Sequence, residues 1–288
     1  MIGTVLALLA AAVYGAGDFV GGLATRRASA LFVVGAGQIA GLLALAVLAP
    51  ALPYESVART DLLWGAASGL STAVGITLLY QALATGRMSV VAPVTALCAL
   101  SVPVLYSFAT SGHPGIVATI GIALAAAAVA LVSHEPDRAA TDADGGAARK
   151  AFALAIGAGL GIGVFYVLLK HTAPGSGLWP LVAGRAVSST LFAVAAVATI
   201  GRWRRAPAPD AALWAAAVGS GLLDATANAL YLVASRHGDL AVVATLTSLY
   251  PASTVLLAVA VLRERLRTVQ LAGLALAACA IVAIAPAG

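Results

Sequence analysis

The chain has 288 residues, of which 61% are hydrophobic and only 9% are charged, with a net charge of +5. A soluble domain carries about 25% charged residues, so a chain this apolar cannot cover its own surface in water, and we expect it to lie in a lipid bilayer. Its Lys and Arg residues fall mainly between apolar runs, which is a loop pattern and argues against a nucleic-acid partner.

Ten apolar runs follow one another along the chain, each about as long as the 20 residues that a membrane-spanning helix needs. Strands of a membrane barrel would instead alternate in polarity over about 10 residues. We therefore predict an all-α integral membrane protein. Its ten transmembrane helices are predicted at about residues 2–24, 30–50, 62–84, 88–110, 115–133, 151–170, 178–200, 211–235, 240–262 and 268–285.

The two halves of the chain resemble each other. Leu79–Leu97 matches Leu230–Leu249 with a one-residue insertion. We therefore expect a five-helix repeat at residues 1–133, a polar linker at 134–150 and a second five-helix repeat at 151–288. Because five is odd, the second unit enters the bilayer inverted, which is a recurring plan among transporters.

Three charged residues lie deepest within predicted spans: Asp18, Arg185 and Asp224. A charge at the bilayer centre costs about 2.5–3.5 kcal/mol, so such residues usually face a cavity or a partner. Asp224 shares one face of its predicted helix with residues four, seven and eleven positions along, which predicts a polar face turned inward. The polar or small residues of this face are Gly221, Asp224, Asn228, Tyr231 and Ser235.

Two roles for Asp224 remain open. It could line a transport path and bind a cationic group or a proton. Alternatively, it pairs with Arg185 or hydrogen-bonds to Asn228 and only holds helices together. Its counterpart in the first half is about Val74, which is apolar, so the scaffold itself does not require a carboxylate there.

Asp18 and Arg185 carry similar alternatives. Asp18, one turn after Tyr14, is either a second ionisable group of the path or a hydrated residue near Arg26 and Arg27. Its counterpart, about Val164, is also apolar. Arg185 either binds a substrate carboxylate or phosphate, gates the path with Asp224, or forms a structural ion pair.

Prolines interrupt two of the predicted spans. Pro93 and Pro103 lie in the fourth span and Pro251 lies in the ninth. Each removes a backbone N–H and frees a carbonyl about one turn back. We interpret Pro251 and Pro103 as candidate gating or kink positions, with tighter packing as the alternative.

The segment "SLYPASTVLLAVAVLRERLRTVQLAGLALAACAIV", Ser248–Val282, resembles the last two helices of EamA-type transporters of the drug/metabolite transporter superfamily. That family places a proline, an E-R-L turn and a Q-x-x-G motif here, matched by Pro251, Arg263-Glu264-Arg265-Leu266 and Gln270 to Gly273. "LVAGRAVSSTLFAV" resembles the Arg-bearing second span of a repeat, with Arg185 in the matching place. The first half departs from the pattern, because Gln38 stands where the Arg would be and Ser111-Gly112-His113 replaces the E-R-L turn.

This resemblance implies a multi-pass transporter, acting as an exporter, in the cytoplasmic membrane of a prokaryote with its termini inside. The charge bias of the loops instead puts both termini outside. We predict a secondary active transporter of a small metabolite such as an amino acid, working by alternating access with coupling to protons at Asp224 or Asp18. The predicted path residues are Asp224, Asn228, Asp18, Arg185, Tyr231, Tyr14 and Gln38.

The expected partners are the bilayer, the substrate and protons, with a homodimer left open and with no cofactor or metal. We do not expect an enzyme. "GAGD", Gly15–Asp18, fits the G-x-G-D motif of intramembrane aspartyl proteases with Asp224 as a conceivable partner, but its context in the chain differs. A channel is the other alternative, although no ring of like charges is visible.

Overall fold

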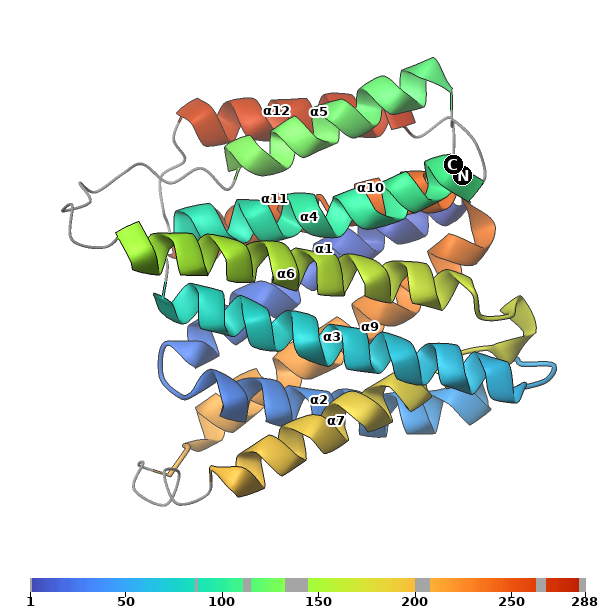
Figure 1. The fold of residues 1–288 in the computed structure, drawn as a ribbon, viewed down its shortest axis with the longest axis vertical. Helices are drawn as coiled ribbons and strands as arrows, with labels where there is room; N and C mark the ends of the chain where they lie inside the picture. The colour runs from blue at the N-terminus through green and yellow to red at the C-terminus, as the bar shows by residue number, and fades with distance from the viewer. Residues whose placement is uncertain are drawn as a thin grey trace.

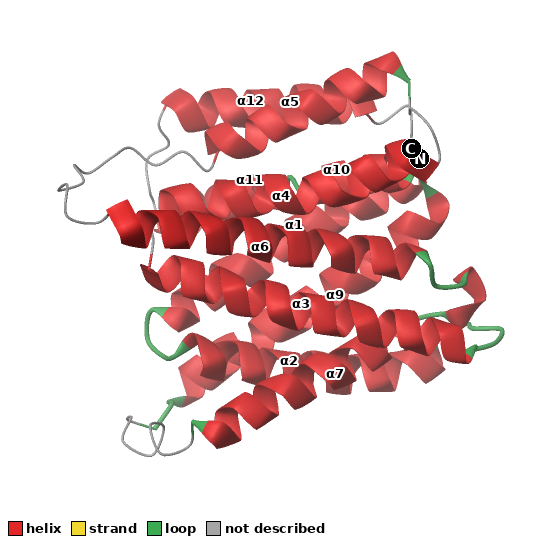
Figure 2. Cartoon of the chain, in the orientation of Figure 1, coloured by secondary structure: helices red, strands yellow, loops and turns green. Residues whose placement is uncertain are grey.

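The computed structural model describes residues 2–85, 88–110, 115–132, 145–199, 208–262 and 268–284. Over these residues the chain is helical and contains no strand (Figures 1 and 2), which confirms the predicted all-α class. The helices are α1 (Ile2–Thr25), α2 (Ala30–Ala51), α3 (Arg59–Thr85), α4 (Met88–Thr110), α5 (Ile116–Val132), α6 (Gly145–Lys170), the short 3-10 helix η1 (Pro174–Ser176), α7 (Trp179–Ala198), α9 (Ala211–His237), α10 (Leu240–Thr247), α11 (Tyr250–Leu262) and α12 (Thr268–Ile284).

Each predicted span coincides with helix. The ninth span is not one continuous helix, because a break at Ser248 and Leu249 divides it into α10 and α11. α6 begins at Gly145, inside the predicted linker, and residues 133–144 lie outside the described residues. The division into 1–133, 134–150 and 151–288 therefore stays a prediction.

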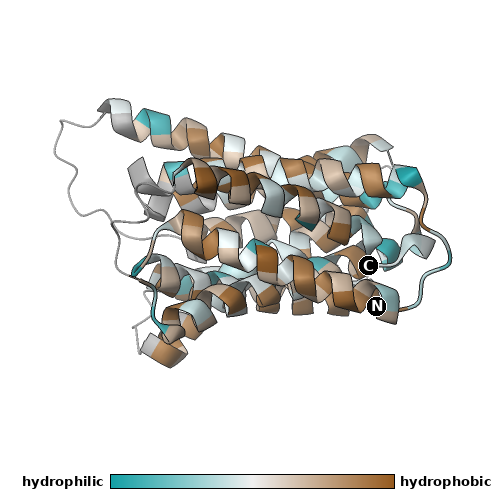
Figure 3. Ribbon diagram, turned by 90° about the horizontal axis from the view of Figure 1, so that it is seen from below, coloured by the Kyte–Doolittle hydropathy of each residue, from teal (hydrophilic) through white to brown (hydrophobic). Residues whose placement is uncertain are grey.

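Seven stretches within the described residues are long and apolar enough to cross a membrane: Ile2–Thr25, Ala30–Ala51, Arg59–Leu79, Ala148–Lys170, Trp179–Ala198, Ala211–His237 and Leu240–Val261. Three further apolar helices are shorter, at Val94–Thr110, Thr119–Leu131 and Thr268–Ala283. Figure 3 shows hydrophobic colouring along much of the helix lengths and hydrophilic patches near helix ends. Of the ten predicted spans, seven thus coincide with stretches long and apolar enough to cross a membrane, and three coincide with shorter apolar helices.

Helices from the first half of the chain pack mainly against helices from the second half. α3 packs against α6 and α7, and α9 packs against α1 and α2. α4 lies on α6, while α10 and α11 lie on α1. α5 pairs with α12, and α2 pairs with α7 (Figure 1). Helices from the beginning of the chain are therefore interleaved with helices from its end.

Glycines permit the closest of these crossings. A Cβ atom on Gly69 would overlap the backbone of Gly184, where α3 crosses α7. A Cβ atom on Gly221 would likewise overlap the backbone of Gly37, where α9 crosses α2. Small residues are the usual means by which membrane helices approach closely. These two contacts set the position of α7 against α3 and that of α2 against α9.

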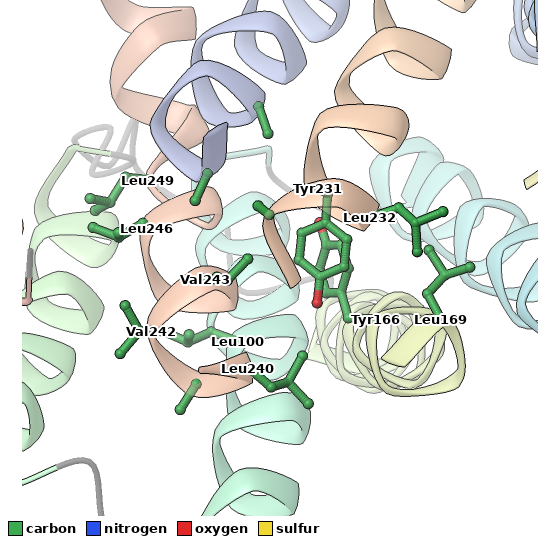
Figure 4. Close-up of a cluster of buried hydrophobic side chains, with 14 of the residues drawn as sticks. Leu100, Tyr166, Leu169, Tyr231, Leu232, Leu240, Val242, Val243, Leu246 and Leu249 are labelled. Carbon is green, nitrogen blue, oxygen red and sulfur yellow. The ribbon is translucent and has the colours of Figure 1, made fainter. Parts of the chain in front are cut away.

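The short helix α10 lies entirely inside the protein. Asp239 caps it by accepting hydrogen bonds from the backbone N–H groups of Ala241 at 2.8 Å and Val242 at 3.3 Å. All eight of its residues are buried, and in Figure 4 Leu240 and Val242 lie next to Leu100 of α4. α10 is therefore enclosed by other helices of the chain.

Candidate functional site

A guanidinium group lies at the meeting point of three helices. Arg185 projects from α7, and only 8% of its side chain is exposed. Its Nη2 donates to Oδ2 of Asp224 on α9, and its Nη1 donates to Oε1 of Gln38 on α2 at 2.8 Å. The ion pair partly neutralises two charges that would each be costly alone in an apolar surrounding.

The polar face predicted on α9 turns inward, as expected. Gly221, Asn228, Tyr231 and Ser235 are all buried, and Asp224 is partly buried. Asn228 donates from Nδ2 to the backbone carbonyl of Asp224 at 2.7 Å and to its Oδ2 at 3.0 Å. Asp224 is therefore bound both by Arg185 and by Asn228.

α1 joins this network through a tyrosine. The hydroxyl of Tyr14 donates to Oδ1 of Asn228 at 2.8 Å. The chain of hydrogen bonds thus runs from Tyr14 through Asn228 and Asp224 to Arg185 and on to Gln38. Five of the seven predicted path residues, from four helices, are brought into one connected network.

Gln38 also accepts from a residue that the sequence reasoning did not single out. Ser188 donates from its hydroxyl to Oε1 of Gln38 at 2.8 Å. Ser188 stands three residues after Arg185 and is buried. Its spacing of about one helical turn places it on the same face as Arg185, so this signal was present in the sequence.

A small cavity borders the network. Its volume is about 20 Å³, which is room for about one water molecule. It is lined by Gln38, Ser68, Gly69, Thr72, Phe165, Leu181, Gly184, Arg185, Ser188 and Asn228. The buried hydroxyl of Thr72 has no hydrogen-bond partner among the described residues, so the cavity holds an unused polar atom beside the ion pair.

Tyr231 lies two turns along α9 from Asp224. It is fully buried, and its ring packs on that of Tyr166 of α6, with centroids 4.3 Å apart (Figure 4). Within the described part of the chain its hydroxyl has no hydrogen-bond partner. Tyr166 was not predicted from the sequence, because nothing in its own span distinguishes it from a packing residue.

Asp18, like Tyr231, is a predicted path residue that stays outside the network. It is exposed, and it has no hydrogen-bond or ion-pair partner among the residues described. Arg27, one of its two expected neighbours, instead pairs with Asp210 at 2.5 Å. Asp18 nevertheless directly follows Gly17, which packs against the backbone of Asp224.

The two candidate kink prolines behave differently. Pro251 is the second residue of α11, directly after the break that separates α10 from α11. Pro103 lies inside α4, which continues through it without interruption. The expected break is therefore found only at Pro251, and a gating role for either proline stays a prediction.

Comparisons with known proteins add to this geometry. Residues 149–285 match the model of the EamA-like transporter family. A solved crystal structure of a protein that is 16% identical in sequence superposes with a TM-score of 0.78, covering 98% of this chain and 95% of its own. At that identity the likeness concerns the fold alone. No curated protein shows significant similarity to the chain.

Proposed function

Because its residues 149–285 match the model of the EamA-like transporter family, we propose that this multi-pass membrane protein is a secondary active transporter that works by alternating access. The finer proposal is export of a small metabolite, such as an amino acid, across the cytoplasmic membrane of a prokaryote, with coupling to protons. The observation that carries it is the network around Arg185, which links four helices through charged groups inside an apolar bundle. Buried ionisable groups of this kind usually mark a substrate or ion pathway.

The packing supports the proposed inverted repeat of ten spans. α3 packs on α6 as α9 packs on α1, and α3 packs on α7 as α9 packs on α2. α4 packs on α6 as α10 and α11 pack on α1. The pairs α2–α7 and α5–α12 correspond to themselves. A twofold relation between the halves produces this pattern of matched and self-matched pairs.

The glycine crossings set the register of the proposed repeat. The contact of Gly69 with Gly184 corresponds to that of Gly221 with Gly37. This register aligns Asp224 with Thr72 and replaces the sequence-based counterpart Val74, which is 49% exposed on the outside of α3. The halves thus share a scaffold, whereas the carboxylate belongs to one half.

The two ends of the bundle support alternating access because they are fastened differently. At the end where α1 begins, Arg236 donates to the carbonyls of Gly177 at 2.9 Å and Ala173 at 3.1 Å. Asp61 accepts from the N–H of Ala173 there at 2.8 Å. At the opposite end the exposed pair of Arg27 and Asp210 ties α1 to α9. A carrier needs one end closed while the other opens.

The alternative of an intramembrane aspartyl enzyme receives less support. Asp18 and Asp224 do lie on helices that pack together. A catalytic pair of carboxylates shares one proton between them. Asp224 is instead hydrogen-bonded to Arg185 and Asn228, which leaves no site shared with Asp18. The family match also favours transport over catalysis.

The experiment is a transport screen of radiolabelled metabolites in proteoliposomes, with and without an imposed pH gradient. We expect at least one compound to show saturable flux that depends on the gradient. Asp224→Asn should reduce that flux and change its pH dependence. Thr226→Val, on the exposed face of the same helix, is the matched control and should leave the flux unchanged. Intact flux and pH dependence in Asp224→Asn would remove Asp224 from the path.

A further inference from the structure

The charges inside the bundle do not balance. Arg185 and Asp224 form an ion pair, so together they carry no net charge. Asp18 lies on the helix that packs against α9, and it has no cationic partner among the described residues. An unpaired carboxylate within a membrane-spanning helix is costly and usually faces a ligand or water. One negative charge is therefore left uncompensated beside the network.

The position of Asp18 on its helix excludes a lipid-facing role. Gly17, the preceding residue, packs against Leu223 and the backbone of Asp224 on α9. Gly15 packs against Tyr250 and Ser253 on α11. Asp18 shares its helix face with Tyr14, one turn earlier, whose hydroxyl reaches Asn228. The face of α1 that carries Asp18 therefore turns toward the other helices. Asp18 is exposed on that face.

Aromatic rings accompany this carboxylate. The rings of Tyr14 and Tyr250 lie with centroids 6.3 Å apart and are both partly buried. The backbone of Tyr250 also packs against Gly15, three residues before Asp18. The faces of tyrosine rings attract ammonium groups electrostatically. A carboxylate beside tyrosine rings is an arrangement suited to an organic cation.

Among the described residues, the basic side chain in the network is already engaged. The guanidinium of Arg185 already donates to Asp224 and Gln38, and its side chain is 8% exposed. Of the other cations on the described helices, Lys170 donates to the carbonyl of Ser235 and Arg236 donates to that of Gly177. Those near the starts of α3 and α6 are exposed, at Arg59, Arg149 and Lys150. A substrate carboxylate would have to displace Asp224 to reach Arg185, whereas an ammonium group can meet Asp18 directly.

We infer that the substrate site selects organic ammonium ions with a net positive charge over zwitterions, and that Asp18 is the residue that binds the ammonium group. This inference rests on the proposed transport function and narrows its substrate class, replacing an amino acid by an amine that lacks a free carboxylate.

The test compares probes that share a skeleton and differ in charge. Phenethylamine, phenylalanine and 3-phenylpropionate carry one positive charge, no net charge and one negative charge, and 3-methylbutylamine and leucine form a second pair. Binding to the purified full-length protein is measured by titration calorimetry. We expect at least one amine to bind about tenfold more tightly than its amino acid, since a hydrogen bond to a charged group contributes about 1.5–3 kcal/mol.

Variants of Asp18 locate the preference. Asp18→Asn should abolish it, Asp18→Glu should retain it, and Thr226→Val should leave it unchanged. Amino acids that bind as well as both amines would overturn the inference, as would an amine preference that survives Asp18→Asn. A circular dichroism melt of each variant verifies that it is folded.

Flux measurements separate this inference from the transport proposal. Saturable leucine or phenylalanine flux without any amine preference supports the transporter and overturns charge selection. An amine preference that depends on Asp18, in a protein that carries none of the probes across the membrane, supports the cation site and contradicts transport of this class.

Discussion

The crossing of α3 with α7 and the crossing of α9 with α2 are built alike but carry different chemistry. Both depend on a glycine pair in backbone contact, Gly69 with Gly184 and Gly221 with Gly37. Yet one turn beyond its glycine α9 presents Asp224, where α3 presents Thr72. The close packing is thus a property of both halves, whereas the ionisable group is a property of one.

The same contrast appears between α2 and α7. Gln38 follows Gly37 directly, just as Arg185 follows Gly184, and the two side chains hydrogen-bond to each other. A neutral amide therefore faces a guanidinium across the contact of the two helices. The two crossings therefore share their close helix packing and differ in the charge carried at equivalent positions.

The largest effect is expected from filling a glycine crossing. A valine at Gly221 would overlap the backbone of Gly37, and a valine at Gly69 would overlap that of Gly184. Because neither backbone can yield easily, we expect each change to cost about 3 kcal/mol or more. Thermal melts in detergent and size-exclusion profiles measure the loss. Gly219→Val is the matched control on α9, since no atom lies within 4 Å of a Cβ there. A stable Gly221→Val protein would contradict the assigned contact.

The next largest loss of stability is expected at Arg185, and it should exceed the loss at its counterpart Gln38. Arg185→Ala removes one member of a largely buried ion pair, and we expect a loss of about 3 kcal/mol, at the low end for such pairs because the Asp224 side chain is 39% exposed. Gln38→Ala removes two accepted hydrogen bonds and should cost only about 1–2 kcal/mol. Both are measured as changes in the free energy of unfolding. Equal losses would mean that the charge adds nothing to the contact.

A smaller effect is expected where α1 joins the network. Tyr14→Phe keeps the ring but leaves Oδ1 of Asn228 without its donor. We expect a loss of about 1 kcal/mol in stability. If the hydrogen bond positions Asn228 toward Asp224, the rate of transport should also fall. Unchanged stability and rate would show that the tyrosine contributes only its ring.

The smallest effect concerns Asp210, which caps α9 at the end far from η1. The hydrogen bond from the N–H of Leu213, and then that from Arg27, hold the pKa of Asp210 below its ordinary value. A lowered pKa in the folded state means that the stabilisation is present above the ordinary pKa and is lost as the pH falls through the lowered one. Asp210→Ala should therefore reduce Tm slightly at neutral pH and by less near about pH 3. A difference in Tm that grows in acid would contradict this assignment.

Much of the fold follows from the apolar pattern. Runs of apolar residues between charged loops gave helix positions that the structure reproduces, because length and hydropathy decide membrane insertion. The break between α10 and α11 was expected only as a kink at Pro251. The sequence suggests about Val74 as the counterpart of Asp224, whereas the proposed register of the glycine crossings aligns Asp224 with Thr72.

The candidate site was predictable within one helix and not between helices. The spacing of Asp224 and Asn228 along α9 already predicted a shared inward face. The donation from Tyr14 to Asn228 and that from Arg185 to Gln38 join residues more than 140 positions apart, which no local spacing reveals. That Asp18 stays unpaired depends equally on tertiary packing.

The most direct test of a carrier is the initial rate of flux against substrate concentration, measured in proteoliposomes for a compound identified by the transport screen. The account predicts a rate that saturates, and that rises when unlabelled substrate is loaded on the opposite side, because the same site must return across the membrane. A rate that stays linear in concentration and ignores substrate on the opposite side would contradict alternating access.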